Sequence, residues 1–149
     1  MNPTSSTATS DLGVTVLRVS LGIMWIAHAL LKLLVFTLPG TAQFFASVGL
    51  PGVLAYPVFI AELAGGVALV LGVYARQVAL ALVPIMVVAA GVHLPNGWVH
   101  TSPGGGWEYP AFLVAASVAL WLLGDGAAAL KRSSAFVPQA GRPPEGLST

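Results

Sequence analysis

The stretch that decides the fold is LGVTVLRVSLGIMWIAHALLKLLVF, residues 12–36. A helix that crosses a bilayer needs about 20 mostly apolar residues. This run is long enough, and its only basic residues are Arg18, His28 and Lys32. It therefore predicts a first membrane-spanning helix. Three further apolar runs follow, and they are separated by clusters of proline and glycine that end helices. We expect these spans at about residues 53–74, 77–93 and 108–123.

The composition supports this class of protein and excludes others. Hydrophobic residues make up 56% of the 149 residues and charged residues only 7%, against about 25% charged in soluble domains. The net charge of +1 offers no basic surface for a nucleic-acid partner. The chain has no cysteine, which excludes disulfides, iron–sulfur ligation and covalently attached haem within it. Redox chemistry here would need a bound cofactor or a partner subunit.

The basic residues outside the spans predict the orientation. Four spans place both termini and the turn near residue 75 on one side of the membrane. That side carries Arg76, Lys131, Arg132 and Arg142, whereas the connections 37–52 and 94–107 contain no lysine or arginine. By the positive-inside rule, both termini are cytoplasmic. The expected organisation is an all-α, integral membrane four-helix bundle over residues 12–130. We expect disordered tails at both ends of the chain: residues 1–11, and the segment 131–149, which carries several basic residues.

Ionisable residues within the spans are the best guide to a site, because a charge in hydrocarbon is costly unless it is paired or lines a wet cavity. At 100° per residue, Arg18, His28 and Lys32 share an arc of about 80° on the first helix. Glu62, near the middle of the second span, is the natural counter-charge. By helical rise it should lie at a depth between Arg18 and His28. This predicts an inner Arg18–Glu62 pair.

An outer cluster of His28, Lys32, His93 and Glu108 is predicted near the outer face of the membrane, where Lys32, His93 and Glu108 reach a similar depth from three different spans. The residues that we predict to take part in proton transfer are Glu62, His28 and Arg18. Candidates for holding a cofactor head group are Lys32, His93, Glu108 and Trp107. His100, in a glycine-rich loop, is expected to be exposed. No histidine spacing typical of a metal site occurs, so no metal ligand is predicted.

Each of these residues also has a structural explanation. Arg18 and Glu62 could form an ion pair that only fixes helix register, and Lys32 could extend to the outer head groups. Glu108 could serve as a carboxylate at the positive end of a helix.

Several motifs, in order, resemble the DoxX family of small four-helix membrane proteins, over about residues 12–126. They are Arg18-x-x-x-Leu-Gly22, His28-x-x-x-Lys32, AQFFASVGLP at 42–51, Glu62-Leu-Ala-Gly-Gly66, LGVYAR at 71–76, His93, and Gly106-Trp-Glu108-Tyr-Pro110. The resemblance implies a bacterial plasma-membrane protein linked to quinone or thiol redox metabolism, since relatives include a subunit of thiosulfate:quinone oxidoreductase.

The leading functional hypothesis is a quinone-interacting subunit of a redox system. In it, the intramembrane cluster supplies proton donors or binds the head group. Any enzymatic role would be that of one subunit acting with a partner redox subunit or as a homo-oligomer. Two alternatives stay open: a non-catalytic assembly or anchor subunit, and a small anion or metabolite transporter.

Overall fold

The computed structural model describes residues 3–134, and these contain helices and no strand, apart from one isolated bridge between Val73 and Lys131. The all-α prediction is therefore confirmed for this part of the chain. The elements in order are α1 (Pro3–Leu30), the π-helical turn η1 (Leu31–Val35), α2 (Leu38–Ser47), the short 3-10 helix η2 (Gly52–Leu54), α3 (Ala55–Leu71), α4 (Ala75–His93), the 3-10 helix η3 (Leu94–Asn96) and α5 (Glu108–Leu123).

Three of the described helices are long and apolar enough to cross a membrane, namely Thr7–Val35, Gly52–Leu71 and Ala75–Asn96. The helix Glu108–Leu123 is apolar but shorter. Large hydrophobic side chains point outward along these helices, and Leu34, Val53 and Phe112 are 71%, 70% and 66% exposed. Water would disfavour so much exposed apolar surface. The apolar helices therefore support a location in the membrane.

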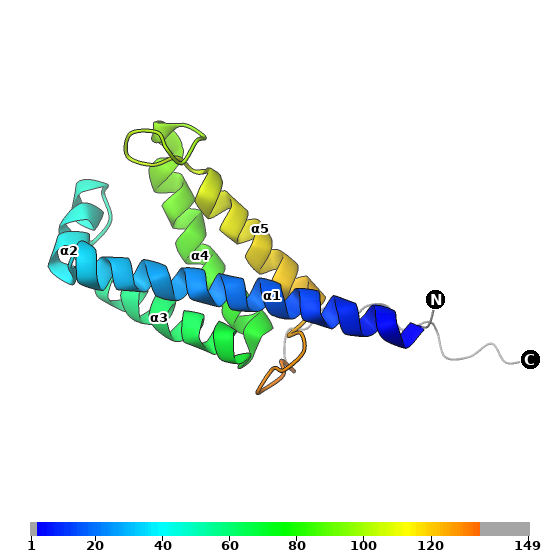
Figure 1. The fold of residues 1–149 in the computed structure, drawn as a ribbon. Helices are drawn as coiled ribbons and strands as arrows, with labels where there is room; N and C mark the ends of the chain where they lie inside the picture. The colour runs from blue at the N-terminus through cyan, green and yellow to red at the C-terminus, as the bar shows by residue number, and fades with distance from the viewer. Residues whose placement is uncertain (1–2, 135–149) are drawn as a thin grey trace, which may run out of the picture.

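The helices form two pairs that diverge like the arms of a V (Figure 1). In one arm α1 packs along α3, and in the other α4 packs along α5. The arms meet where α3 turns into α4, and α2 and the loop after α4 lie at their far ends. The fold thus has a narrow end and a wide end.

The α1–α3 arm is held at a very short distance by two glycines that face each other. A Cβ placed on Gly66 would lie 2.8 Å from the carbonyl oxygen of Gly22, and one on Gly22 would lie 2.7 Å from the carbonyl oxygen of Gly66. Close approach of this kind through small residues is how helices associate in lipid. The contact fixes the register: Gly22 faces Gly66, and one turn away Ile26 lies beside Gly66 as well.

The narrow end is fastened by the segment that follows α5. Lys131 N–H donates to the Gly72 carbonyl at 3.0 Å, and Tyr74 N–H donates to the Lys131 carbonyl at 2.8 Å. Asp125 is buried and accepts the backbone N–H groups of Arg76 and Ser133 at 3.3 and 2.9 Å. These bonds join α4, the α3–α4 turn and the end of α5.

Three segments outside the predicted spans contain structure that was not predicted from the sequence. The helix α1 begins at Pro3, inside the part that was expected to be a disordered tail (residues 1–11). The connection 37–52 contains the helix α2, which the Thr37 side chain caps by accepting the Gly40 N–H at 3.2 Å. Of the expected tail 131–149, the structure describes residues 131–134, and these are tied to the bundle. Residues 135–149 lie outside the described part.

Candidate functional site

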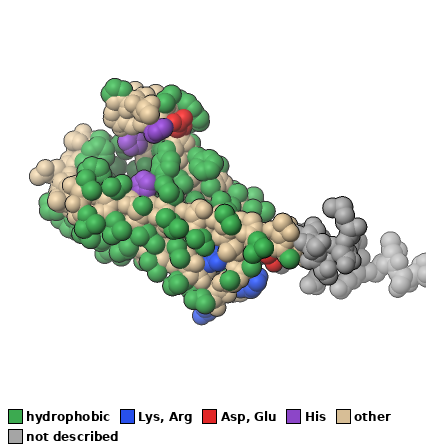
Figure 2. Space-filling view, in the orientation of Figure 1, with side chains coloured by type: hydrophobic (Ala, Val, Ile, Leu, Met, Phe, Trp, Pro, Cys, Tyr) green, Lys and Arg blue, Asp and Glu red, His purple; other side chains and the backbone are tan. Residues whose placement is uncertain are grey.

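A cavity of about 590 Å³ opens between the two arms of the V. Figure 2 shows it as a hollow in the surface, with histidine side chains gathered around it. Most of the lining is apolar, from Phe44 and Phe45 of α2 to Val88 and Val92 of α4. A largely apolar cavity of this size that holds a few convergent polar groups is typical of small-molecule binding sites.

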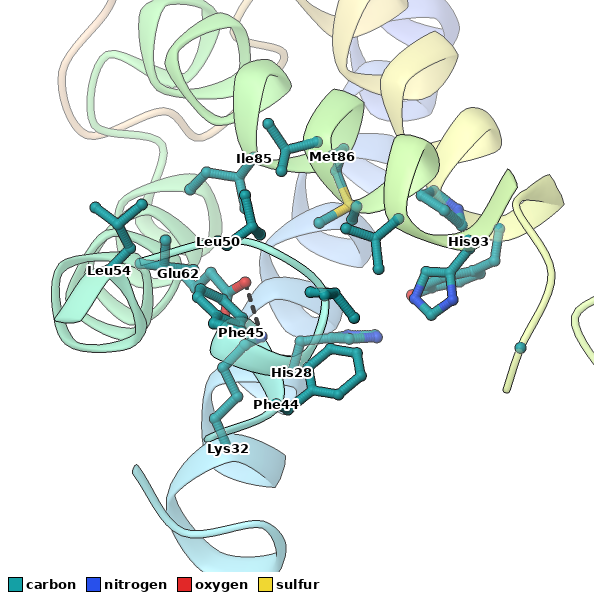
Figure 3. Close-up of a pocket in the computed structure, with 18 of the residues that line it drawn as sticks. His28, Lys32, Phe44, Phe45, Leu50, Leu54, Glu62, Ile85, Met86 and His93 are labelled. Carbon is teal, nitrogen blue, oxygen red and sulfur yellow. Dashed lines mark hydrogen bonds and ion pairs between the residues drawn. The ribbon is translucent and has the colours of Figure 1, made fainter. Parts of the chain in front are cut away.

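The strongest polar feature of the wall is an ion pair between Lys32 of η1 and Glu62 of α3 (Figure 3). Lys32 Nζ lies 2.9 Å from Glu62 Oε1 and 2.7 Å from Oε2. The side chains are 18% and 2% exposed. The lysine is therefore the accessible partner and the carboxylate is the enclosed one. When an ion pair is this well shielded from water, removing either member strongly destabilises the fold, because the other charge is left buried and unpaired.

The predicted Arg18–Glu62 pair is wrong, because the register of the two helices separates these residues. With Gly22 facing Gly66 and Ile26 beside it, Glu62 lies near Ile26, one turn along α3 from the glycine contact. Arg18 is then about 12 Å away along α1, at 1.5 Å per residue. Lys32 is about 9 Å away on the other side, a distance that the lysine and glutamate side chains span together.

Arg18 instead fastens the narrow end and does not line the cavity. It is 2% exposed, and its guanidinium donates to the carbonyls of Leu69, Val70 and Ala127 at 3.0, 3.2 and 3.3 Å. Two of these acceptors belong to the last turn of α3, where carbonyls lack helical partners and a cation is favourable. At this position Arg18 links α1 to the end of α3 and to Ala127; its predicted catalytic role stays a prediction.

We expect Arg18→Met to lower the stability of the protein by about 2 kcal/mol, because three carbonyls lose a charged donor in a buried place. The measurement is unfolding in mixed micelles followed by tryptophan fluorescence. Arg132→Met removes an exposed cation and is the control, expected to change stability by less than about 0.5 kcal/mol. Equal effects of the two changes would contradict the structural role of Arg18.

His28 and His93 both lie on the cavity wall, as Figure 3 shows. His28 Nδ1 is 2.8 Å from the Met24 carbonyl of its own helix. Its ring stacks on Tyr109 of α5, with centroids 5.4 Å apart and an interplanar angle of 18°. His93 Nδ1 is 3.0 Å from the carbonyl of Gly104. Hydrogen bonds to backbone carbonyls thus fix the orientation of both rings, which lie on different arms of the V.

Glu108 and Trp107 are placed differently from the expectation, since neither lines the cavity. Glu108 accepts both the backbone N–H of His100 at 2.7 Å and its ring Nδ1 at 2.8 Å. Trp107 packs edge-to-face against Trp98, with ring centroids 4.4 Å apart. Both residues therefore organise the loop between α4 and α5.

Sequence reasoning missed three kinds of wall residue. His100 is exposed, as expected, with a side-chain exposure of 69%, yet it also borders the cavity. Tyr109 contributes the ring that supports His28. Phe44 and Phe45 come from α2, which was not predicted as a helix. The spacing of His100 and Glu108 in the loop carried no signal for their contact.

Within residues 3–134, no group of three or more His, Asp or Glu side chains is arranged to hold a metal ion.

The apolar helices and the cavity define a membrane protein with an internal cavity that carries a few polar side chains. The chain belongs to the DoxX family, whose family model matches residues 13–100, and the resemblance drawn from its motifs is confirmed. It is 41% identical over 68 residues to "Putative oxidoreductase CatD" of Bacillus subtilis (strain 168). That alignment covers 46% of this chain and 49% of the relative, so it spans about half of each protein. No solved structure matches the chain.

Proposed function

We propose that this protein is a quinone-binding subunit of a membrane oxidoreductase. The observation that carries the proposal is the cavity, in which Lys32, Glu62, His28 and His93 meet walls that are otherwise largely apolar. A quinone combines a polar head group with an apolar tail, so its recognition needs this combination of surfaces. The name of the Bacillus relative supports an oxidoreductase role.

The chemistry of a bound quinone would be its reduction to quinol, which consumes two electrons and two protons. We propose that the electrons come from a partner redox subunit and the protons from the aqueous side through the open cavity. Within this chain, Lys32 would donate a hydrogen bond to a head-group oxygen, since the ammonium has three donors and Glu62 engages two. Glu62 would hold the ammonium in place.

We further propose four spans, with α5 as the fourth, in the plasma membrane of a bacterium. Arg76 and Lys131 lie at the narrow end of the V, and Trp98 and Trp107 lie in the loop at the wide end. The positive-inside rule would place the narrow end and both termini in the cytoplasm. The cavity would then open towards the outer leaflet, where a quinone tail could leave between the arms into lipid.

The test is a binding titration with decylubiquinone, a short-tailed quinone, on the full chain in nanodiscs. We expect saturable binding with one site per chain. Lys32→Met and Glu62→Gln should each weaken it at least tenfold, because each removes one half of the polar anchor. Lys131→Met is the matched control and should bind as the wild type does. That lysine lies over the Tyr74 ring, 4.9 Å from its centroid, at the opposite end of the fold.

Two results would contradict the proposal. One is the absence of saturable binding to the wild-type protein. The other is unchanged affinity in both Lys32→Met and Glu62→Gln while these variants remain folded, since the cavity anchor would then have no part in binding. The alternative of a purely structural subunit predicts the first result.

A further inference from the structure

The hydrogen bonds of the cavity histidines fix which ring nitrogen carries the proton. A backbone carbonyl can only accept a hydrogen bond. His28 Nδ1, 2.8 Å from the Met24 carbonyl oxygen, must therefore be the protonated nitrogen. The bond lies within one helix, between residues four apart, so it is built into α1 and does not depend on a ligand.

The same assignment holds for His93 on the other arm. Its Nδ1 lies 3.0 Å from the Gly104 carbonyl oxygen, which also accepts from the side-chain amide of Asn96 at 3.0 Å. The third histidine follows the pattern, since His100 Nδ1 lies 2.8 Å from the Glu108 carboxylate. All three rings thus use Nδ1 as a donor to an oxygen of the protein.

In a neutral imidazole, protonation at Nδ1 leaves Nε2 as a hydrogen-bond acceptor. Nothing in the part of the chain that the structure describes binds Nε2 of His28 or of His93. Both rings belong to the cavity wall. The rings of His28 and His93 therefore offer two free acceptors, one from each arm, beside the ammonium of Lys32. The exposed His100 at the edge of the cavity, whose Nδ1 is bound to Glu108, leaves its Nε2 as a third acceptor.

We infer that this site favours the reduced ligand, a quinol, over the quinone; the inference rests on the proposed quinone-binding function. A quinone presents two carbonyl oxygens, which only accept hydrogen bonds and so find no partner at either Nε2. A quinol presents two hydroxyl groups, each able to donate to one Nε2, while a hydroxyl oxygen can still accept from Lys32. The acceptors set the redox form that is bound, and His28 and His93 are the residues that determine this specificity.

The preference has a redox consequence. Tighter binding of the reduced form raises the midpoint potential of the bound couple, by about 30 mV for each tenfold preference in a two-electron reaction. A quinone at this site would thus become a better electron acceptor than the same quinone in the lipid pool.

The experiment compares decylubiquinone with decylubiquinol, the latter under anaerobic conditions, on the full chain in nanodiscs. We expect the wild type to bind the quinol at least tenfold more tightly. His28→Asn and His93→Asn test the assignment, because the asparagine amide can still donate to the carbonyl that Nδ1 serves but lacks the ring Nε2. Each should weaken quinol binding about tenfold and change quinone binding less than twofold. His28→Phe, which keeps a ring against Tyr109, should behave like His28→Asn.

The outcomes separate this inference from the function on which it rests. Saturable binding of both forms with equal affinity, or tighter binding of the quinone, overturns the inference and leaves the proposed function standing. A quinol preference that persists in all three histidine variants also overturns it. Binding of neither form to the wild type removes the proposed function, and the inference is overturned with it.

Discussion

Lys32→Met should destabilise the protein by about 3 kcal/mol or more, one of the two largest effects we expect from a single substitution. The change leaves the Glu62 carboxylate, only 2% exposed, without its cation. Removing one member of a buried ion pair typically costs about 3–5 kcal/mol, because the remaining charge is desolvated and unpaired. The free energy of unfolding in mixed micelles measures the effect.

The double variant Lys32→Met/Glu62→Met separates a structural pair from a functional one. Replacing both charges with apolar side chains of similar volume is often neutral for stability. We therefore expect the double variant to recover to within about 1 kcal/mol of the wild type, while quinone binding stays lost. A single variant as stable as the wild type would show that Glu62 does not depend on Lys32 for its place in the fold. Full binding by the double variant would assign the pair to structure alone.

Gly66→Leu should destabilise the protein by about 3 kcal/mol, at the upper end of the cost of overfilling a packed interface. Even the Cβ would lie 2.8 Å from the Gly22 carbonyl oxygen and 2.9 Å from the backbone nitrogen of Ile26. Backbone atoms cannot rotate away as a side chain can, so α1 and α3 would have to separate. Because Lys32 lies on η1, which continues α1, and Glu62 lies on α3, the ion pair should be lost as well.

Gly91→Leu is the matched control for this prediction. Gly91 is exposed in α4, and a Cβ there would have no neighbouring heavy atom within 4 Å. Leucine favours helix over glycine by up to about 1 kcal/mol, so this variant should be as stable as the wild type or slightly more so. The measurement is the free energy of unfolding of the two variants, compared under the same conditions. If Gly66→Leu proves no less stable than Gly91→Leu, the close α1–α3 contact is not the one that holds this arm together.

The helices and the family could be predicted from the sequence because both depend on local patterns. Apolar runs interrupted by proline and glycine predicted α3, α4 and α5 to within a few residues of their observed bounds. The N-terminal part of α1 was missed because its Ser- and Thr-rich residues carry no apolar signal. The helix α2 was missed because its ten residues are too few to resemble a span.

The candidate site could be predicted only in part, because helix register is not a local property. His28, Lys32, Glu62 and His93 were selected as charged or polar residues within apolar runs, and all four lie on one cavity; their roles stay predictions. Depth counted along each helix could not show that the Gly22–Gly66 contact moves Glu62 away from Arg18. The contact of Glu108 with His100 depends on the path of a loop, which residue spacing does not determine.

The bonds at the narrow end form a pivot between the two arms, and towards the wide end the arms also touch where His28 of α1 stacks on Tyr109 of α5. The Arg18, Asp125 and Lys131 bonds all lie at that pivot, whereas the cavity lies between the tips. The 19 residues of α4 form an arm about 28 Å long. A rotation of about 5° at the pivot would therefore move the tip by about 2.5 Å, close to the width of one hydrogen-bonded contact. With His28 on one arm and His93 on the other, the angle at the pivot sets whether a single ligand can touch both rings at once.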